Sequence, residues 1–217
     1  MPLIDPNFEW MQTFSGKRFH FQFTPPEDID IVDIAHALSN KPRFGGHLDN
    51  TFTVGQHSLV ISRLLPPEFA LEGLLHDCAE AYLPDVYTPL KMMMKRLGFD
   101  YNALIEEPVE KAIFSRFDLQ FPLTTDAKFV IKKWDWISVL MERELFARAK
   151  LPWEQVPYEK YGIDETLLSY DKTLWEKMQL LPPDEVKNQF LQAFKYLAKE
   201  RFGLNCLPKY FDIRSPE

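Results

Sequence analysis

The most informative stretch of this sequence reads Leu74-Leu75-His76-Asp77-Cys78-Ala79-Glu80-Ala81. It lies in a helix that the sequence predicts over residues 68–83, ended by Pro84. The apolar residues of this segment follow helical spacing but are spread widely around the axis, which is typical of a central, buried helix. His76, Asp77 and Glu80 therefore need partners, because burying unpaired polar groups would cost several kcal/mol.

The spacing of these polar residues suggests a common centre. His76 and Glu80 are four residues apart and share one face of the expected helix. Asp77 lies about 100° further round the axis and can approach the same centre. The alternative is a hydrogen-bonded core histidine beside a surface aspartate and a surface glutamate.

Helical signals dominate the rest of the chain. Thr53 is a candidate N-cap for a helix over residues 54–65, and Thr124-Thr125-Asp126 offers caps for a long helix ending at residue 149. Further helices are expected over residues 29–38, 90–97, 101–117 (with a kink or break at Pro108), 164–179 and 183–202. Alternation within residues 18–23 predicts a short strand. We expect an all-α fold, a helical bundle of about seven helices.

A chain of 217 residues is long enough for one domain with decorations. We expect a single domain over residues 1–217, with its core at about 30–150. Residues 1–30 would form an N-terminal cap, and residues 151–217 a C-terminal helical extension with its last helix ended by Gly203.

Composition limits the classes of function. The net charge of −7 disfavours non-specific binding to double-stranded DNA, which needs a basic surface. The sequence contains no run of 18 apolar residues and no secretory signal, so we expect no membrane span. The two cysteines, Cys78 and Cys206, are expected to be thiols in a reducing cytoplasm.

Two further residues are candidates for the same centre as His76. His57 lies on the helix expected before it, and short proline-rich connections favour antiparallel neighbours, so His57 can face His76. Asp135 lies between Trp134 and Trp136 on the long helix, where a carboxylate is often half-buried. Taken alone, Asp135 would be interpreted as a structural, helix-surface carboxylate.

In order and helical context, His57, His76-Asp77 and Asp135 resemble the ligand pattern of the HD-domain phosphohydrolase superfamily. The longer stretch over residues 76–91 is similar to a subgroup of bacterial 5′-deoxynucleotidases and phage dATP triphosphohydrolases. The resemblance extends over about residues 40–150. It implies an HD-type helical domain, and members of this kind are often homo-oligomers.

The resemblance implies a metal site formed by His57, His76, Asp77 and Asp135. Two imidazoles and two carboxylates suit a divalent ion such as Mn²⁺, Co²⁺, Fe²⁺, Ni²⁺ or Zn²⁺. Glu80 corresponds to the residue that positions the attacking water or takes its proton, with the orientation of a histidine ligand as its alternative role. Asp85 corresponds to a residue tied to sugar recognition and catalysis, and otherwise would be an ordinary loop aspartate.

Candidate substrate contacts surround this set. Arg43, Lys91 and Lys132 are expected to contact phosphates, and Phe44 to stack on a base. His47 is a further candidate. The subgroup usually has Trp where this chain has Phe44, which leaves the strength of stacking open. Alternatively, each of these three cations could be an ordinary surface residue without a role in binding.

The expected function is metal-dependent hydrolysis of a deoxynucleotide in the cytoplasm of a bacterial cell or a phage-infected host. Three cations suit a long phosphate chain and favour a dNTP triphosphohydrolase of the dATP type. A 5′-deoxynucleotidase acting on dNMPs is the first alternative, and a non-catalytic sensor of metal and nucleotide is the second. A sensor would be expected to have lost a ligand or Glu80, and this chain has all of them.

Overall fold

The computed structural model describes residues 9–21, 24–151, 154, 156–164, 171–204 and 210. Within them the protein is mostly helical, which confirms the all-α class. The helices are α1 (Ile31–Asn40), α2 (Val54–Leu64), α3 (Ala70–Leu74), α4 (Thr88–Arg96), α5 (Glu107–Arg116), α6 (Thr125–Phe146), α7 (Tyr158–Tyr161), α8 (Thr173–Gln179) and α9 (Pro183–Phe202). The short α7 lies where no helix was expected.

Helix α2 is the centre of the bundle. Its residues 54–62 are all buried, and it contacts α1, α3, α6, α8 and α9. Thr53 caps it as the sequence predicts: its Oγ1 accepts a hydrogen bond from the Gln56 amide, and Gln56 Oε1 accepts one from the Thr53 amide. The helix therefore starts at a fixed residue, and this start fixes the direction of His57 within the core.

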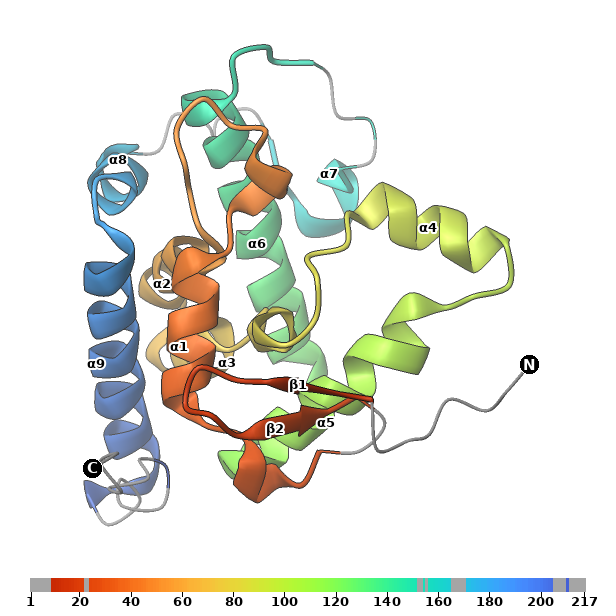
Figure 1. The fold of residues 1–217 in the computed structure, drawn as a ribbon. Helices are drawn as coiled ribbons and strands as arrows, with labels where there is room; N and C mark the ends of the chain where they lie inside the picture. Colours follow the sequence, from red (N-terminus) through yellow and green to blue (C-terminus); the bar gives the residue numbers. More distant parts are fainter. Residues whose placement is uncertain are drawn as a thin grey trace.

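The long helix α9 runs beside α1 along one edge of the molecule (Figure 1). Val186, Phe190 and Phe194 have no exposed surface and share one hydrophobic cluster with α1 and α2. The C-terminal region thus contributes to the main core. In contrast, α4 has no buried residue and projects from the body of the molecule (Figure 1).

The N-terminal region forms a hairpin of β1 (Trp10–Gln12) and β2 (Arg18–His20), paired antiparallel with Met11 opposite Phe19. The expected strand is therefore present but shorter, with its residues 22 and 23 outside the described part. Phe19 is buried and stacks on Tyr82, with ring centroids 4.1 Å apart. This contact fastens the hairpin to the helical core.

The helix expected over residues 68–83 is wrong as a continuous helix. The chain forms a 3₁₀ turn at Pro67–Phe69, the short α3, and a second 3₁₀ turn at Cys78–Ala81. Leu75 and Asp77 have non-helical backbone angles. His76 Nδ1 lies 2.8 Å from the Gly73 carbonyl oxygen, which is the acceptor that an α-helix would offer to the amide of residue 77. His76 and Asp77 consequently lie on a turn, not in the middle of a helix.

The other helix limits agree with the sequence to within a few residues. Thr124 caps α6 through a hydrogen bond from the Ala127 amide, and α6 ends at Phe146. The expected break at Pro108 is present: a π-helical turn, Asn102–Glu106, leads into α5 with the proline in its first turn. Part of the helix expected over 164–179 lies outside the described residues, and α8 covers its end. None of the described helices has the length and apolar character that a membrane span requires.

Candidate metal centre and pocket

Three side chains from distant parts of the chain meet inside the bundle. His57 comes from α2, His76 from the turn after α3, and Asp135 from α6. Each offers one ligand atom, and these atoms all lie within 4.8 Å of one another. His57 Nε2 lies 3.2 Å from His76 Nε2 and 3.2 Å from Asp135 Oδ1, and His76 Nε2 lies 4.0 Å from Asp135 Oδ1. This group could hold a metal ion.

Asp77 lies at the same point. Its Oδ2 atom is 3.2 Å from His76 Nε2 and 3.8 Å from His57 Nε2. Adjacent ligands of an octahedral ion with bonds of about 2.1 Å lie about 3.0 Å apart, and opposite ligands about 4.2 Å apart. The five distances given above fall between those limits, so the spacing of His57, His76 and Asp135 fits a shared ion, and Asp77 lies close to both histidine nitrogens.

Both histidines are oriented for ligation through Nε2. The Nδ1 atom of His57 lies 2.5 Å from Glu142 Oε1, and that of His76 lies 2.8 Å from the Gly73 carbonyl oxygen. Carboxylates and carbonyls only accept hydrogen bonds, so each Nδ1 is the donor. In the neutral imidazole this leaves the lone pair of each Nε2 directed at the common centre.

The charges around the centre favour a cation there. Burial and the Arg43 guanidinium lower the pKa of His57, but the carboxylates of Glu142 and Asp135 outweigh them and raise it to about 9. Burial opposes ionisation of Asp77, yet His76 holds the pKa of that carboxyl well below its usual value. Asp135 is likewise held anionic against burial, chiefly by Lys132 and His57, with a strongly lowered pKa.

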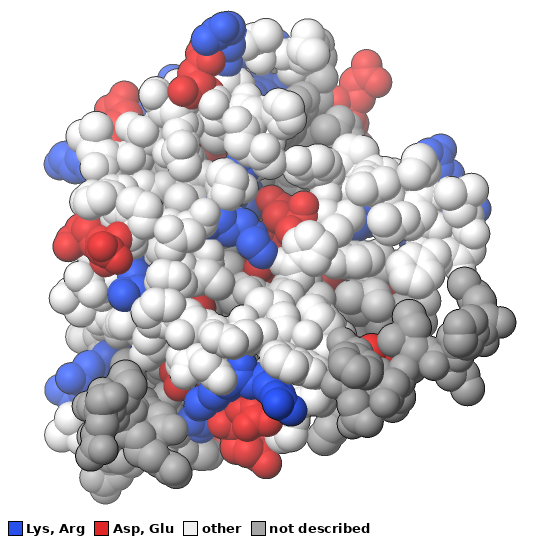
Figure 2. Space-filling view, in the orientation of Figure 1, with Lys and Arg blue, Asp and Glu red and all other residues white. Residues whose placement is uncertain are grey.

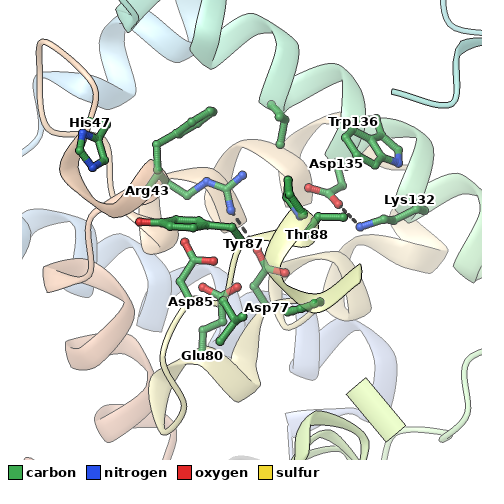
Figure 3. A pocket seen from close by; sticks show the side chains of 15 residues that line it. Arg43, His47, Asp77, Glu80, Asp85, Tyr87, Thr88, Lys132, Asp135 and Trp136 are labelled. Atoms are coloured by element: carbon green, nitrogen blue, oxygen red, sulfur yellow. Dashed lines mark hydrogen bonds and ion pairs between the residues drawn. The ribbon is translucent and has the colours of Figure 1, made fainter. Parts of the chain in front are cut away.

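A pocket of about 430 Å³ lies against this centre (Figure 3). Asp77 and Asp135 form part of its wall. The residues that the sequence predicts around the substrate also line it, namely Arg43, Phe44, His47, Glu80, Asp85, Lys91 and Lys132. The structure thus brings the complete set of candidate catalytic and substrate residues to one cavity. The segment that carries Asp77 and Glu80 into its wall consists of short turns, where a continuous helix was expected.

Glu80 has an unusual environment in the pocket. It is 8% exposed, and its buried Oε2 has no hydrogen-bond partner among the described residues. Burial, together with the charges of Asp77 and Asp85, raises the pKa of Glu80 well above its ordinary value. Burial and the charge of Asp77 also raise the pKa of Asp85, against the opposing charge of Arg43. Both carboxyls can therefore hold a proton more readily than an exposed acid.

Each of the three expected phosphate-binding cations already contacts a carboxylate. Arg43 is almost buried, with Nε 3.1 Å from Glu142 Oε2 and Nη1 3.4 Å from Asp77 Oδ2. Lys91 Nζ lies 2.5 Å from Glu106 Oε1. Lys132 Nζ lies 2.6 Å from Asp135 Oδ2 (Figure 3). These pairs hold the cations at the pocket wall.

Several residues next to the candidate site were not identified from the sequence. Glu142 is the most important, and it lies seven residues after Asp135, a spacing that places both on one face of α6. Lys41 donates hydrogen bonds to the Glu80 and Leu83 carbonyl oxygens, and so fixes the segment that carries Glu80. Tyr87 and Trp136 add aromatic surface to the pocket.

The fold and the site together define an all-α protein with a buried His/Asp group that could hold a metal ion. No family model matches the chain. It is 39% identical over 134 residues to the uncharacterized protein YfdR of Escherichia coli. That alignment covers 62% of this chain and 70% of YfdR. It is 33% identical over 203 residues to the uncharacterized protein RCAP_rcc00048 of Rhodobacter capsulatus. That alignment covers 89% of this chain and 98% of the Rhodobacter protein. The chain belongs to the family of these two proteins.

Proposed function

We propose that the protein is a metal-dependent phosphohydrolase of deoxynucleotides. One observation carries the proposal: the His/Asp centre opens into a pocket that also holds two carboxyl groups of raised pKa and three cations. This combination supplies a metal site, acid–base groups and phosphate contacts within one cavity. The resemblance to HD-domain phosphohydrolases supports the same reaction class.

The ligands of the ion would be His57, His76, Asp77 and Asp135. Nitrogen and oxygen donors of this kind suit Mn²⁺, Co²⁺, Fe²⁺, Ni²⁺ or Zn²⁺. When bound, such an ion polarises a phosphoryl oxygen and makes water a stronger nucleophile. The protein would keep the two aspartates ionised and the two histidines oriented, and it would place the substrate pocket beside the ion.

Glu80 would position the attacking water and take its proton. No donor among the described residues meets its buried Oε2, and its raised pKa makes it a better base than an exposed glutamate. Asp85, on the same wall, would contact the sugar. Figure 3 shows both carboxylates directed toward Arg43 and Asp77.

Arg43, Lys91 and Lys132 would contact the phosphates, and Phe44 would stack on the base. Three cations around one cavity favour a triphosphate, so a dNTP triphosphohydrolase of the dATP type is the first candidate. Figure 2 shows acidic and basic side chains interspersed on the face in view, where the described residues form no extended basic patch, and this suits a small-molecule substrate better than double-stranded DNA.

A second candidate, a 5′-deoxynucleotidase acting on dNMPs, is favoured by the size of the pocket. A volume of about 430 Å³ is near the lower end for small-molecule sites. Each cation also shares its charge with a carboxylate, so the net positive charge available to a long phosphate chain is reduced.

The test is a product analysis with mono-, di- and triphosphates of each deoxynucleoside, each assayed with several divalent metals. Release of inorganic triphosphate from a dNTP supports the first candidate, and release of phosphate from a dNMP supports the second. Nucleotide binding without turnover under every metal would make the protein a sensor and overturn the proposed activity.

A further inference from the structure

We propose that Glu142 is a positioning residue that joins the metal centre to the phosphate-binding arginine. The inference rests on the proposed function, because it assigns a role within the same site. It concerns a residue that does not line the pocket and would touch neither the metal nor the substrate.

Each oxygen of Glu142 has a separate partner. Oε1 lies 2.5 Å from His57 Nδ1 and accepts a hydrogen bond from Ser138 Oγ at 2.9 Å. Oε2 accepts one from Arg43 Nε at 3.1 Å. The Glu142 side chain has no exposed surface, so water cannot replace these partners.

The contact with His57 determines which nitrogen faces the metal centre. An ionised carboxylate can only accept, so it holds the His57 proton on Nδ1 and leaves Nε2 as the ligand atom in the neutral ring. A carboxylate behind a ligating histidine also increases its basicity. Glu142 thus sets the orientation, the tautomer and the ligand strength of His57.

The contact with Arg43 determines how the guanidinium meets the pocket. Arg43 has five N–H donors, and Glu142 and Asp77 engage Nε and Nη1. Because Glu142, which lies outside the pocket, accepts the hydrogen bond from Nε, the guanidinium lies at the pocket wall in a fixed orientation. One carboxylate therefore orients a metal ligand through one oxygen and a phosphate contact through the other.

The Glu142 carboxylate is itself held in place. Ser138 Oγ, which donates to Glu142, accepts a hydrogen bond from Trp175 Nε1 at 2.9 Å, and all three side chains are buried. This chain of contacts extends from α8 through α6 to the metal centre. An amide cannot replace the carboxylate, because Gln has one acceptor oxygen and an NH₂ group that would face either His57 Nδ1 or Arg43 Nε.

The experiment measures Mn²⁺ affinity of the full-length protein by competition with a chromophoric chelator, in the absence of nucleotide. We expect Glu142→Gln to weaken Mn²⁺ binding by about 10–100-fold, the usual effect of losing a partner behind a metal ligand. It should also raise KM for the nucleotide, because Arg43 loses its orientation. Glu142→Asp keeps the charge and should recover part of both losses.

Glu72→Gln is the matched control. Glu72 is also a largely buried carboxylate paired with an arginine, Arg201, through bonds of 2.9 and 3.0 Å, but it lies outside the pocket. This variant should bind Mn²⁺ as the wild type does. If Glu142→Gln does not fold, Glu142→Asp and Ser138→Ala must each weaken Mn²⁺ binding more than Glu72→Gln.

The outcomes separate the two proposals. A wild type that binds none of Mn²⁺, Co²⁺, Fe²⁺, Ni²⁺ and Zn²⁺ overturns the metal centre, and the role of Glu142 falls with it. A wild type that binds Mn²⁺, together with folded Glu142 variants of equal affinity, overturns only the role of Glu142.

Discussion

The hydroxyl group of Tyr87 lies against the backbone of Gly45 and leaves no room for a side chain there. A β-carbon on Gly45 would lie 1.7 Å from the Tyr87 hydroxyl oxygen, and the φ angle of Gly45 is +58°, a value that favours glycine. Phe44 before it also has a positive φ, of 53°. The loop that carries Arg43 and Phe44 is thus shaped to fit beneath Tyr87 at the pocket wall.

We expect Gly45→Ala to displace the half-exposed Tyr87 from this loop and to raise KM for the nucleotide several-fold. Gly46→Ala is the control, because Gly46 also has a positive φ but nothing lies within 4 Å of its β-carbon position. Tyr87→Ala should reproduce the KM of Gly45→Ala, and the double variant should add nothing. Equal KM values for the Gly45 and Gly46 variants would show that the Tyr87 contact does not shape the site.

Asp77→Ala should empty the metal site and abolish turnover, because it removes an anionic ligand next to both histidines. Elemental analysis after metal loading and desalting measures the effect. Asp33→Ala is a suitable control, since Asp33 is a more deeply buried aspartate whose partner is Ser15 and neither residue lines the pocket. Metal content equal to that of the wild type would make the assignment of Asp77 wrong.

Glu80→Gln should separate binding from chemistry. The amide keeps the size of Glu80 but cannot take a proton, so we expect kcat to fall by ~10²–10⁴. Metal content and KM should stay close to wild-type values. A kcat near that of the wild type would exclude Glu80 as the group that positions the water.

Phe44 should contribute to binding through its ring. Phe44→Ala is expected to weaken binding of all bases by ~1–3 kcal/mol, the usual range for base stacking on an aromatic side chain. Phe44→Trp should preserve or improve turnover of purine nucleotides. Unchanged nucleotide kinetics in both variants, with a simple phosphoester still hydrolysed, would place the nucleotide elsewhere.

Glu110 on α5 should make stability depend on pH. Burial and the charge of Glu106 raise its pKa to about 7, above the unfolded value of 4.5. A raised pKa means that its favourable contribution is present at low pH and is lost as the pH rises through 7. Glu110→Gln should therefore raise the free energy of unfolding at pH 8 by about 1–3 kcal/mol, with the difference vanishing toward pH 4.

Denaturant unfolding at both pH values measures this difference. Glu200→Gln, at an exposed position of α9, is the control and should have little effect at either pH. A Glu110→Gln variant with the same stability as the wild type at pH 8 would contradict the raised pKa.

The sequence predicted those features of the fold that depend on neighbouring residues. Thr53 and Thr124 cap their helices because the cap bonds join residues three apart. The break after α3 was missed because it depends on contacts with distant helices: the turn directs His76 and Asp77 toward His57 and Asp135. The partner strand Trp10–Gln12 was missed because its pairing is made only in the folded hairpin.

The candidate site likewise contains residues that the local sequence could predict and residues that depend on contacts between distant segments. Its histidines and carboxylates could be selected from residue type and spacing, since such groups are rarely placed in apolar segments without a role. Glu142 could have been found from its seven-residue spacing to Asp135, with Ser138 between them on the same face. Nothing local in the sequence indicates that it would meet Arg43, which lies 99 residues earlier.

The candidate ligands come from α2, the turn after α3 and α6, so an ion held by them would cross-link three segments that are remote in sequence. An ion that binds only the folded chain adds its binding free energy to the resistance to unfolding, by about 2.7 kcal/mol at a free concentration of 100 times Kd. The midpoint of thermal unfolding should then rise with metal concentration and fall with a chelator. Metal supply in the cell would then set the fraction of the protein that stays folded.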